Sequence, residues 1–168
     1  RARAAGFDVN LLRKQVAFER FLARLFQGED PRWVLKGGYA LELRLRERTR
    51  TTLDLDLAPI RVGETDLLEA LREAAEEDLG DFFEFHVRAR GMLRGAVLGG
   101  GRFEVEADLA GRLFERFVLD VGVSAGEARP AEWVEGKADL SFAGLARPRI
   151  AVCALEEQFA DKLHAYTR

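Results

Sequence analysis

The sequence predicts an α/β (α+β) fold in which a mixed, mostly antiparallel sheet is flanked by helices. Residues 8–27 and 64–79 carry apolar side chains at helical spacing. Residues 51–58 alternate between apolar and polar side chains, as a half-buried strand does. Four more strand-like runs then follow one another with short turns between them, which is typical of an antiparallel meander. This mixture of interleaved helices and consecutive strands favours one sheet with helices packed on it.

The elements of the first half begin with a helix. Asp8 or Asn10 can cap its start, and it runs to about Gln27, where the sequence GEDPR ends it. Four elements are predicted next: a short buried strand at residues 33–36, a tight turn at Gly37 and Gly38, a helix at residues 39–47 and the alternating strand at residues 51–58.

The second half opens with a strongly amphipathic helix at residues 64–79. The four strand-like runs are residues 82–90, 94–100, 102–110 and 116–124, with hairpin turns expected at the glycines 99–101 and at residues 110–112. Residues 124–149 have weak periodicity and predict a long connection. A last helix is expected at residues 155–168.

Composition limits the class of protein. A chain of 168 residues can bury roughly 70% of its unfolded surface, so it needs neither disulfides nor a structural metal to fold. The single cysteine, Cys153, excludes an intramolecular disulfide and fits the reducing cytoplasm. No window approaches the length of about 18 apolar residues that a membrane span requires.

Charge is more informative in its distribution than in its sum. A net charge of −3 argues against a protein that coats nucleic acid. Only 4 of the 26 basic residues are lysines, a bias that a GC-rich genome explains as readily as phosphate binding does. The run Arg44, Arg46, Arg48 and Arg50 predicts either a basic edge or the solvated end of a helix.

Asp54 and Asp56 are the first candidates for chemistry. One residue separates them on a strand, so their side chains share a face about 7 Å apart at Cα, while Leu53, Leu55 and Leu57 are expected to point into the core. Carboxylates about 5 Å apart at an effective dielectric near 20 repel by about 3 kcal/mol. An open strand face tolerates this repulsion, whereas a cleft requires a cation, for which carboxylate oxygens favour Mg²⁺ or Mn²⁺.

Three other features are candidates for the same site. Gly37 and Gly38 leave bare backbone N–H groups at a helix start, where phosphate oxygens bind, although many strand-to-helix turns contain such a pair. Asp120 points away from its apolar neighbours, either to solvent or as a third ligand, with Asp108 ranked second for that role. Lys162 is either a solvated lysine or an ammonium directed at a phosphate. The histidines, Cys153 and the serines form no recognisable zinc site or catalytic triad.

Taken together, the segments LKGGYAL, RTTLDLDL and EEQFADKLHA resemble the AbiEii/AbiGii toxin family of nucleotidyltransferases, which includes the MenT-like toxins, within the DNA polymerase β-like superfamily. The family pattern maps onto residues in three places: Lys36, Gly37 and Gly38; Arg50, Thr52, Asp54 and Asp56; and Glu156, Glu157, Ala160, Lys162 and Leu163.

The resemblance implies a nucleotidyltransferase domain spanning residues 1–168 and truncated at its C-terminus, since the family continues into a basic–Asp motif after the helix at residues 155–168. It implies Mg²⁺ or Mn²⁺ on Asp54 and Asp56, with Asp120, or a residue outside this sequence, completing the carboxylate set and activating the acceptor hydroxyl. Triphosphate contacts come from the glycine turn with Lys36, and from Arg50, Thr52 and Lys162.

The implied reaction transfers a nucleoside monophosphate from an NTP and releases pyrophosphate. The implied acceptor is tRNA, with arginines between Arg44 and Arg50 on its backbone, and the implied partner is a cognate antitoxin. Two alternatives remain open at the level of sequence: a small-molecule nucleotidyltransferase of the antibiotic-modifying kind, and a non-catalytic nucleotide-binding module of the same fold. An acidic acceptor pocket would favour the first.

Overall fold

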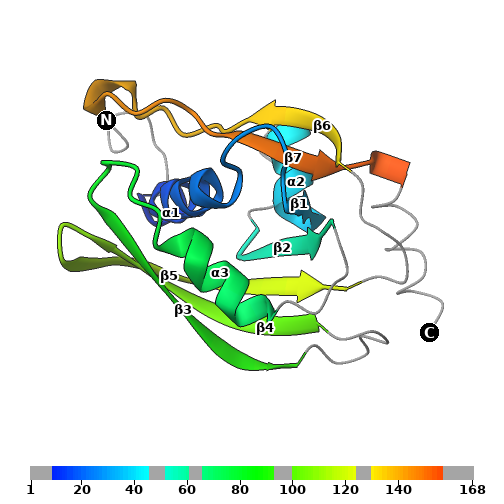
Figure 1. Ribbon diagram of the computed structural model, residues 1–168. Coiled ribbons are helices and arrows are strands. Elements are labelled where there is room, and N and C mark those ends of the chain that lie inside the picture. The colour runs from blue at the N-terminus through cyan, green and yellow to red at the C-terminus, as the bar shows by residue number, and fades with distance from the viewer. Residues whose placement is uncertain (1–8, 46–51, 61–65, 93–99, 124–129, 157–168) are drawn as a thin grey trace.

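The computed structural model describes residues 9–45, 52–60, 66–92, 100–123 and 130–156. Its described strands form one seven-stranded sheet in the order β3 (Phe83–Met92), β4 (Gly100–Leu109), β5 (Arg112–Gly122), β2 (Asp54–Pro59), β1 (Trp33–Lys36), β7 (Arg149–Cys153) and β6 (Pro130–Glu135). All neighbouring strands are antiparallel except β2 with β5 and β1 with β7, which are parallel. The expected mixed, mostly antiparallel sheet is therefore confirmed (Figure 1).

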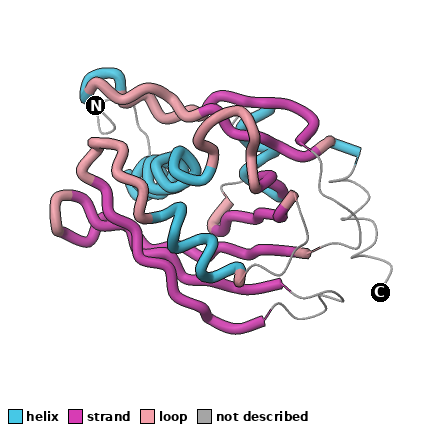
Figure 2. Tube along the Cα trace, in the orientation of Figure 1, coloured by secondary structure: helices cyan, strands magenta, loops and turns pink. Residues whose placement is uncertain are grey.

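Three α-helices flank this sheet in the described part of the chain. α1 (Val9–Leu25) packs on β5 (Arg112–Gly122) and on β7 (Arg149–Cys153), and α3 (Leu67–Ala75) packs on β3 (Phe83–Met92) and β4 (Gly100–Leu109). α2 (Gly37–Leu45) contacts β1 (Trp33–Lys36), β2 (Asp54–Pro59) and β6 (Pro130–Glu135). Figure 2 shows α1 enclosed between the two limbs of the curved sheet.

Aromatic side chains hold α1 against the strands. Phe18 meets Phe117 edge-on at 4.9 Å between ring centroids, and Phe21 lies 5.3 Å from Phe85. Both α1 phenylalanines are almost fully buried, so each removes a large apolar surface from water. This packing fixes the inner face of β5, and alternation along the strand then directs Asp120 to the outer face.

Two buried polar networks tie the helices to the loops. Asp81 accepts hydrogen bonds from Arg20 Nε at 2.6 Å and from Arg24 Nη2 at 2.7 Å, and all three side chains are buried. Glu19 accepts from the Tyr39 hydroxyl at 2.9 Å and from the Ala138 N–H at 2.9 Å. Because Tyr39 is in the first turn of α2, the Glu19 network anchors the start of that helix to α1.

Most expected elements are present with shifted ends. α1 ends at Leu25, two residues before the expected Gln27. α3 begins at Leu67 because Asp66 caps it, accepting a hydrogen bond from the Leu68 N–H at 2.9 Å, and it ends at Ala75, four residues before the expected end. The turn between β4 and β5 is confirmed: Ala110 and Gly111 both have positive φ, at 50° and 74°, as a type I′ hairpin requires.

Three expectations are wrong. Residues 124–149 are not one long connection, because β6 occupies residues 130–135 and β7 begins at Arg149. Gly100 and Gly101 lie inside β4 rather than in a turn. Leu53 precedes β2 and is 63% exposed, whereas Leu55 and Leu57 are buried as expected. Residues 93–99 and those after Glu156, including most of the expected last helix, lie outside the described residues.

Candidate active site

The turn between β1 and α2 lies directly against Asp56. Gly37 has φ +66°, a conformation that L side chains rarely adopt. A Cβ at Gly37 would stand 1.9 Å from Asp56 Oδ2 and 2.7 Å from Asp56 Cγ. Glycine is therefore required here both for its backbone conformation and for the space that the carboxylate fills.

The next glycine makes the same kind of contact with Thr52. A Cβ at Gly38 would stand 2.3 Å from the Thr52 hydroxyl oxygen. The two glycines at the start of α2 thus each lie against a side chain that the sequence assigned to the site. The expected glycine turn and the aspartate strand are one contiguous structure.

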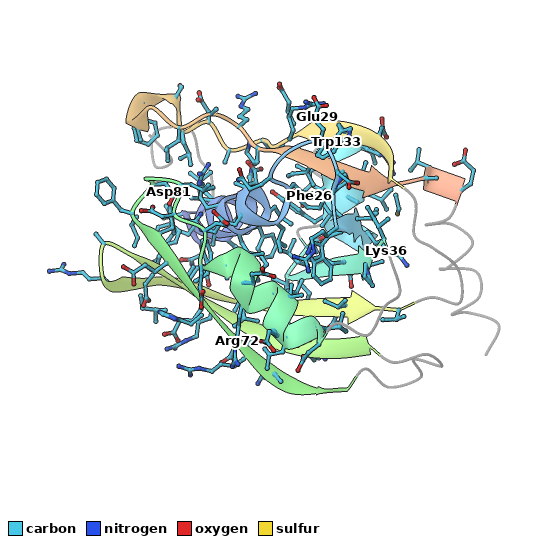
Figure 3. All side chains as sticks on the ribbon, in the orientation of Figure 1. Phe26, Glu29, Lys36, Arg72, Asp81 and Trp133 are labelled. Atoms are coloured by element: carbon cyan, nitrogen blue, oxygen red, sulfur yellow. The ribbon has the colours of Figure 1, made fainter. Side chains whose placement is uncertain are left out.

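Strand register aligns three charged residues side by side. Lys36 of β1 pairs with Asp56 of β2, and Asp56 pairs with Asp120 of β5. Neighbouring strands lie about 4.8 Å apart, so these residues form a row across three central strands. Asp54, two residues earlier on β2, shares the face of Asp56. In Figure 3 Lys36 marks the end of β1 where this row lies, on the opposite side of the view from Asp81.

The electrostatics of this row disfavour further negative charge. Burial, together with the charges of Asp120 and Asp54, raises the pKa of Asp56 to about 6, although Lys36 and Arg102 oppose the shift. A cation placed beside these carboxylates would relieve the same repulsion.

Arg102 is a site residue that sequence reasoning missed. It lies on β4 directly opposite Asp120 and donates from Nε to Oδ1 at 2.8 Å and from Nη2 to Oδ2 at 2.7 Å. This fork raises the pKa of the Arg102 guanidinium, and the charges of Asp54 and Asp56 add to the effect. Arg102 therefore acts on all three aspartates while it binds only one.

Asp108, the second-ranked candidate for the third carboxylate, does not lie beside Asp54 and Asp56, so that prediction is wrong. Asp108 lies six residues after Arg102 on β4, which is about 20 Å along a strand. Asp108 lies beside His86 instead, at 3.6 Å between Oδ2 and Nε2. Asp108 is thus on the outer face of the sheet, but at the opposite end from Asp54 and Asp56.

The expected role of Arg44 in contacting an RNA backbone is also wrong. Its side chain is 8% exposed and forms an ion pair with Glu132, and it donates a further hydrogen bond to the Cys153 carbonyl. Arg44 therefore ties α2 to β6 and β7. Arg46, Arg48, Arg50 and Lys162 lie outside the described residues.

The carboxylates fit a hard divalent cation by their chemistry. Asp54, Asp56 and Asp120 offer oxygen donors on one face of the sheet, and strand register sets Asp56 beside Asp120. Within the described ranges, no three acidic, histidine or cysteine side chains already converge as a metal cluster. Asp120 instead directs both its oxygens to Arg102.

Comparison with known proteins identifies the family of this chain. The family model described as "Nucleotidyl transferase AbiEii toxin, Type IV TA system" matches residues 20–168. Among solved structures, the chain is similar to MenT4, the nucleotidyltransferase toxin Rv2826c from Mycobacterium tuberculosis H37Rv, with 25% identity and a TM-score of 0.61. No curated protein matches the chain.

The structural match covers 99% of this chain but only 57% of MenT4, so the chain spans little more than half the length of that toxin. In the part of the chain that the structure describes, no helix is long and apolar enough to cross a membrane. The family model extends over most of the chain, including the glycine turn and the aspartate strand. This chain therefore belongs to the AbiEii family of nucleotidyltransferase toxins.

Proposed function

We propose that this protein transfers a nucleoside monophosphate from an NTP to an acceptor, tRNA, and acts as the toxin of a toxin–antitoxin system. One observation carries the proposal: the Gly37–Gly38 turn packs against Asp56 and Thr52, so a phosphate-binding backbone and an acidic face adjoin. Membership of the AbiEii family, and the likeness to a toxin described as a nucleotidyltransferase, support the same reaction.

The glycine turn binds the triphosphate in this proposal. The N–H groups at the start of α2 lie at the positive end of the helix dipole, which favours an anion, and the absence of Cβ atoms at Gly37 and Gly38 lets Asp56 and Thr52 lie directly against this turn. The Thr52 hydroxyl, which lies against Gly38, donates a hydrogen bond to a phosphate oxygen. Lys36, in the row with Asp56 and Asp120, adds positive charge.

Asp54, Asp56 and Asp120 hold Mg²⁺ or Mn²⁺ in this proposal. When bound, the cation offsets charge on the triphosphate and orients the leaving oxygens. The acceptor hydroxyl attacks the α-phosphorus, the bond between that phosphorus and the α–β bridging oxygen breaks, and pyrophosphate leaves with that oxygen. Asp120 accepts the proton of the attacking hydroxyl. In-line positioning and charge stabilisation are most of what this reaction requires.

The remaining roles rest on the family resemblance. Lys162 and Arg50 neutralise the phosphates, and a cognate antitoxin blocks the activity. The site of action is the cytoplasm, where NTPs and tRNA are both present.

The test is to incubate the full-length protein with Mg²⁺, total tRNA and each of the four NTPs labelled at the α-phosphate. The wild type is expected to label RNA with at least one NTP. Asp54→Asn is expected to reduce labelling at least about 100-fold, since Asp54 would help to hold the cation at the reacting phosphate. Absence of label on RNA with every NTP would reject the proposed acceptor.

A matched pair of aspartates tests the placement of the site. Asp120→Asn is expected to reduce labelling by at least about 10-fold, because it removes a carboxylate beside Asp56. Asp108→Asn, on the same face but at the far end of β4, is expected to label RNA at the wild-type rate. Equal losses in the two variants, measured as initial rates, would contradict the placement.

A further inference from the structure

Two arginine–carboxylate pairs bridge β4 and β5 on the outer face of the sheet, each between residues directly opposite in register. Arg102 binds Asp120, and Arg116 binds Glu106, each with a 2.7 Å contact. The arginine side chains are 50% and 55% exposed, and their partners are 16% and 19% exposed. The two pairs are therefore matched in register and solvent access, although Arg102 binds both oxygens of its partner and Arg116 binds one.

The surroundings of the two pairs differ. Arg116 lies among carboxylates of the sheet face that have basic neighbours of their own, since Glu104 is 3.6 Å from Arg90 and Asp108 is 3.6 Å from His86. Arg102 instead binds the third member of the aspartate group that includes Asp54 and Asp56. With Lys36, it supplies the positive charge among these acids.

We propose that Arg102 is a specificity-determining residue that makes the acidic face select a metal–triphosphate complex over a free divalent cation. This inference rests on the proposed function. In this structure the Arg102 guanidinium donates to both oxygens of Asp120 and supplies positive charge where a cation would otherwise be favoured. When the metal–triphosphate complex binds, the fork exchanges the carboxylate for phosphate oxygens, which match its geometry equally well.

The charge of Arg102 acts with opposite sign on the two ligands. A free divalent cation about 6 Å from the guanidinium is repelled enough, even in a water-like dielectric, to weaken its binding about tenfold. The complex of a divalent cation with an NTP carries net negative charge, so the same guanidinium strengthens its binding. A merely structural role for Arg102 would weaken both kinds of binding when the residue is lost.

The experiment measures Mn²⁺ binding to the full-length protein by calorimetry without nucleotide. Arg102→Gln is expected to bind Mn²⁺ about tenfold more tightly than the wild type, and Arg116→Gln to bind it as the wild type does. Arg102→Lys keeps the charge but loses the fork, so it is expected to stay close to wild-type affinity. A second titration uses the Mn²⁺ complexes of the four α,β-imido NTPs, whose nucleoside monophosphate cannot be transferred. Arg102→Gln is expected to bind the analogue that the wild type binds most tightly about tenfold more weakly than the wild type does.

Equal or weaker Mn²⁺ binding by Arg102→Gln would overturn the inference, as would a matching change in Arg116→Gln. So would an Arg102→Lys variant that behaves like Arg102→Gln, because the charge would then not be the cause. These results do not depend on RNA labelling. If no NTP is transferred but Arg102→Gln still binds Mn²⁺ more tightly, the counter-ion role of Arg102 is supported and only the proposed reaction fails.

Discussion

Replacing Gly37 by alanine is expected to reduce nucleotidyl transfer at least about 100-fold. The added methyl group would stand 1.9 Å from Asp56 Oδ2, so Asp56 or the start of α2 must move. A displacement of about 1 Å at a reacting centre costs on the order of 100-fold in rate. The measurement is the initial rate of label transfer from the α-labelled NTP.

Gly28→Ala is the control for backbone strain. Gly28 has φ +76°, close to the +66° of Gly37, but a Cβ there meets nothing within 4 Å. Both variants are expected to lose about 1 kcal/mol of unfolding free energy from the left-handed conformation, and Gly37→Ala loses more if the turn cannot shift. Only Gly37→Ala is expected to lose transfer. Full activity in that variant would show that the contact with Asp56 is not needed for the reaction.

Asp81→Asn is expected to lower the free energy of unfolding by about 3–5 kcal/mol. The substitution leaves Arg20 and Arg24 buried without their common counter-charge, and an uncompensated buried charge costs that much. Glu73→Gln is the control, because its ion pair with Arg32 has side chains 72% and 58% exposed and is worth at most about 1 kcal/mol. Urea unfolding measures both, and similar changes in the two variants would contradict this account of the pair.

The stabilisation by Asp81 is expected to disappear in acid. Burial alone would raise the pKa of Asp81, but hydrogen bonds from Arg24, Arg20 and the Phe83 N–H hold the pKa below its ordinary value of 3.8. A carboxylate whose pKa is lower in the folded state stabilises the fold above its unfolded pKa and loses that effect as pH falls toward the folded value. The difference between wild type and Asp81→Asn should therefore be constant above about pH 5 and shrink below pH 3.8. A constant difference down to pH 2 would contradict the direction of the shift.

The sequence predicted the elements with strong local signals. Helical spacing in α1 and α3 and alternation in β2 and β5 located those elements within a few residues. The same alternation correctly directed Asp120 away from Phe117, Leu119 and Val121, which are buried. Local pattern suffices where one side of an element faces the core and the other faces water.

β7 was missed because its residues lack that alternation. Ile150, Ala151, Val152 and Cys153 are all buried, since a strand inside the sheet is covered on both faces. Its pairing with β1 is parallel and joins residues more than 100 positions apart, which no local signal indicates. Leu53 was misplaced for the converse reason: alternation was extended beyond the start of β2, where the sheet no longer covers the side chain.

Arg102 was missed because a β-bulge sets its register. Counting back from the two-residue turn at Ala110 and Gly111 places Arg102 opposite Leu119, a core residue. The shift between Ala107 and Asp108 moves the pairing by one residue and brings Arg102 opposite Asp120. The apolar faces of β4 and β5 match only if this extra residue is present. The alternation of apolar residues along the two strands therefore indicated the correct register, whereas the length of the turn did not.

In the proposed function the glycine turn and the aspartate face form one nucleotidyl-transfer site. The most direct test uses two samples of the NTP that supports labelling, one labelled at the α-phosphate and one at the γ-phosphate, with wild type and Asp56→Asn. Wild type is expected to transfer the α-label to RNA and to release the γ-label as pyrophosphate, and Asp56→Asn to do neither. Transfer of the γ-label to RNA, or undiminished α-label transfer by Asp56→Asn, would contradict the proposed function.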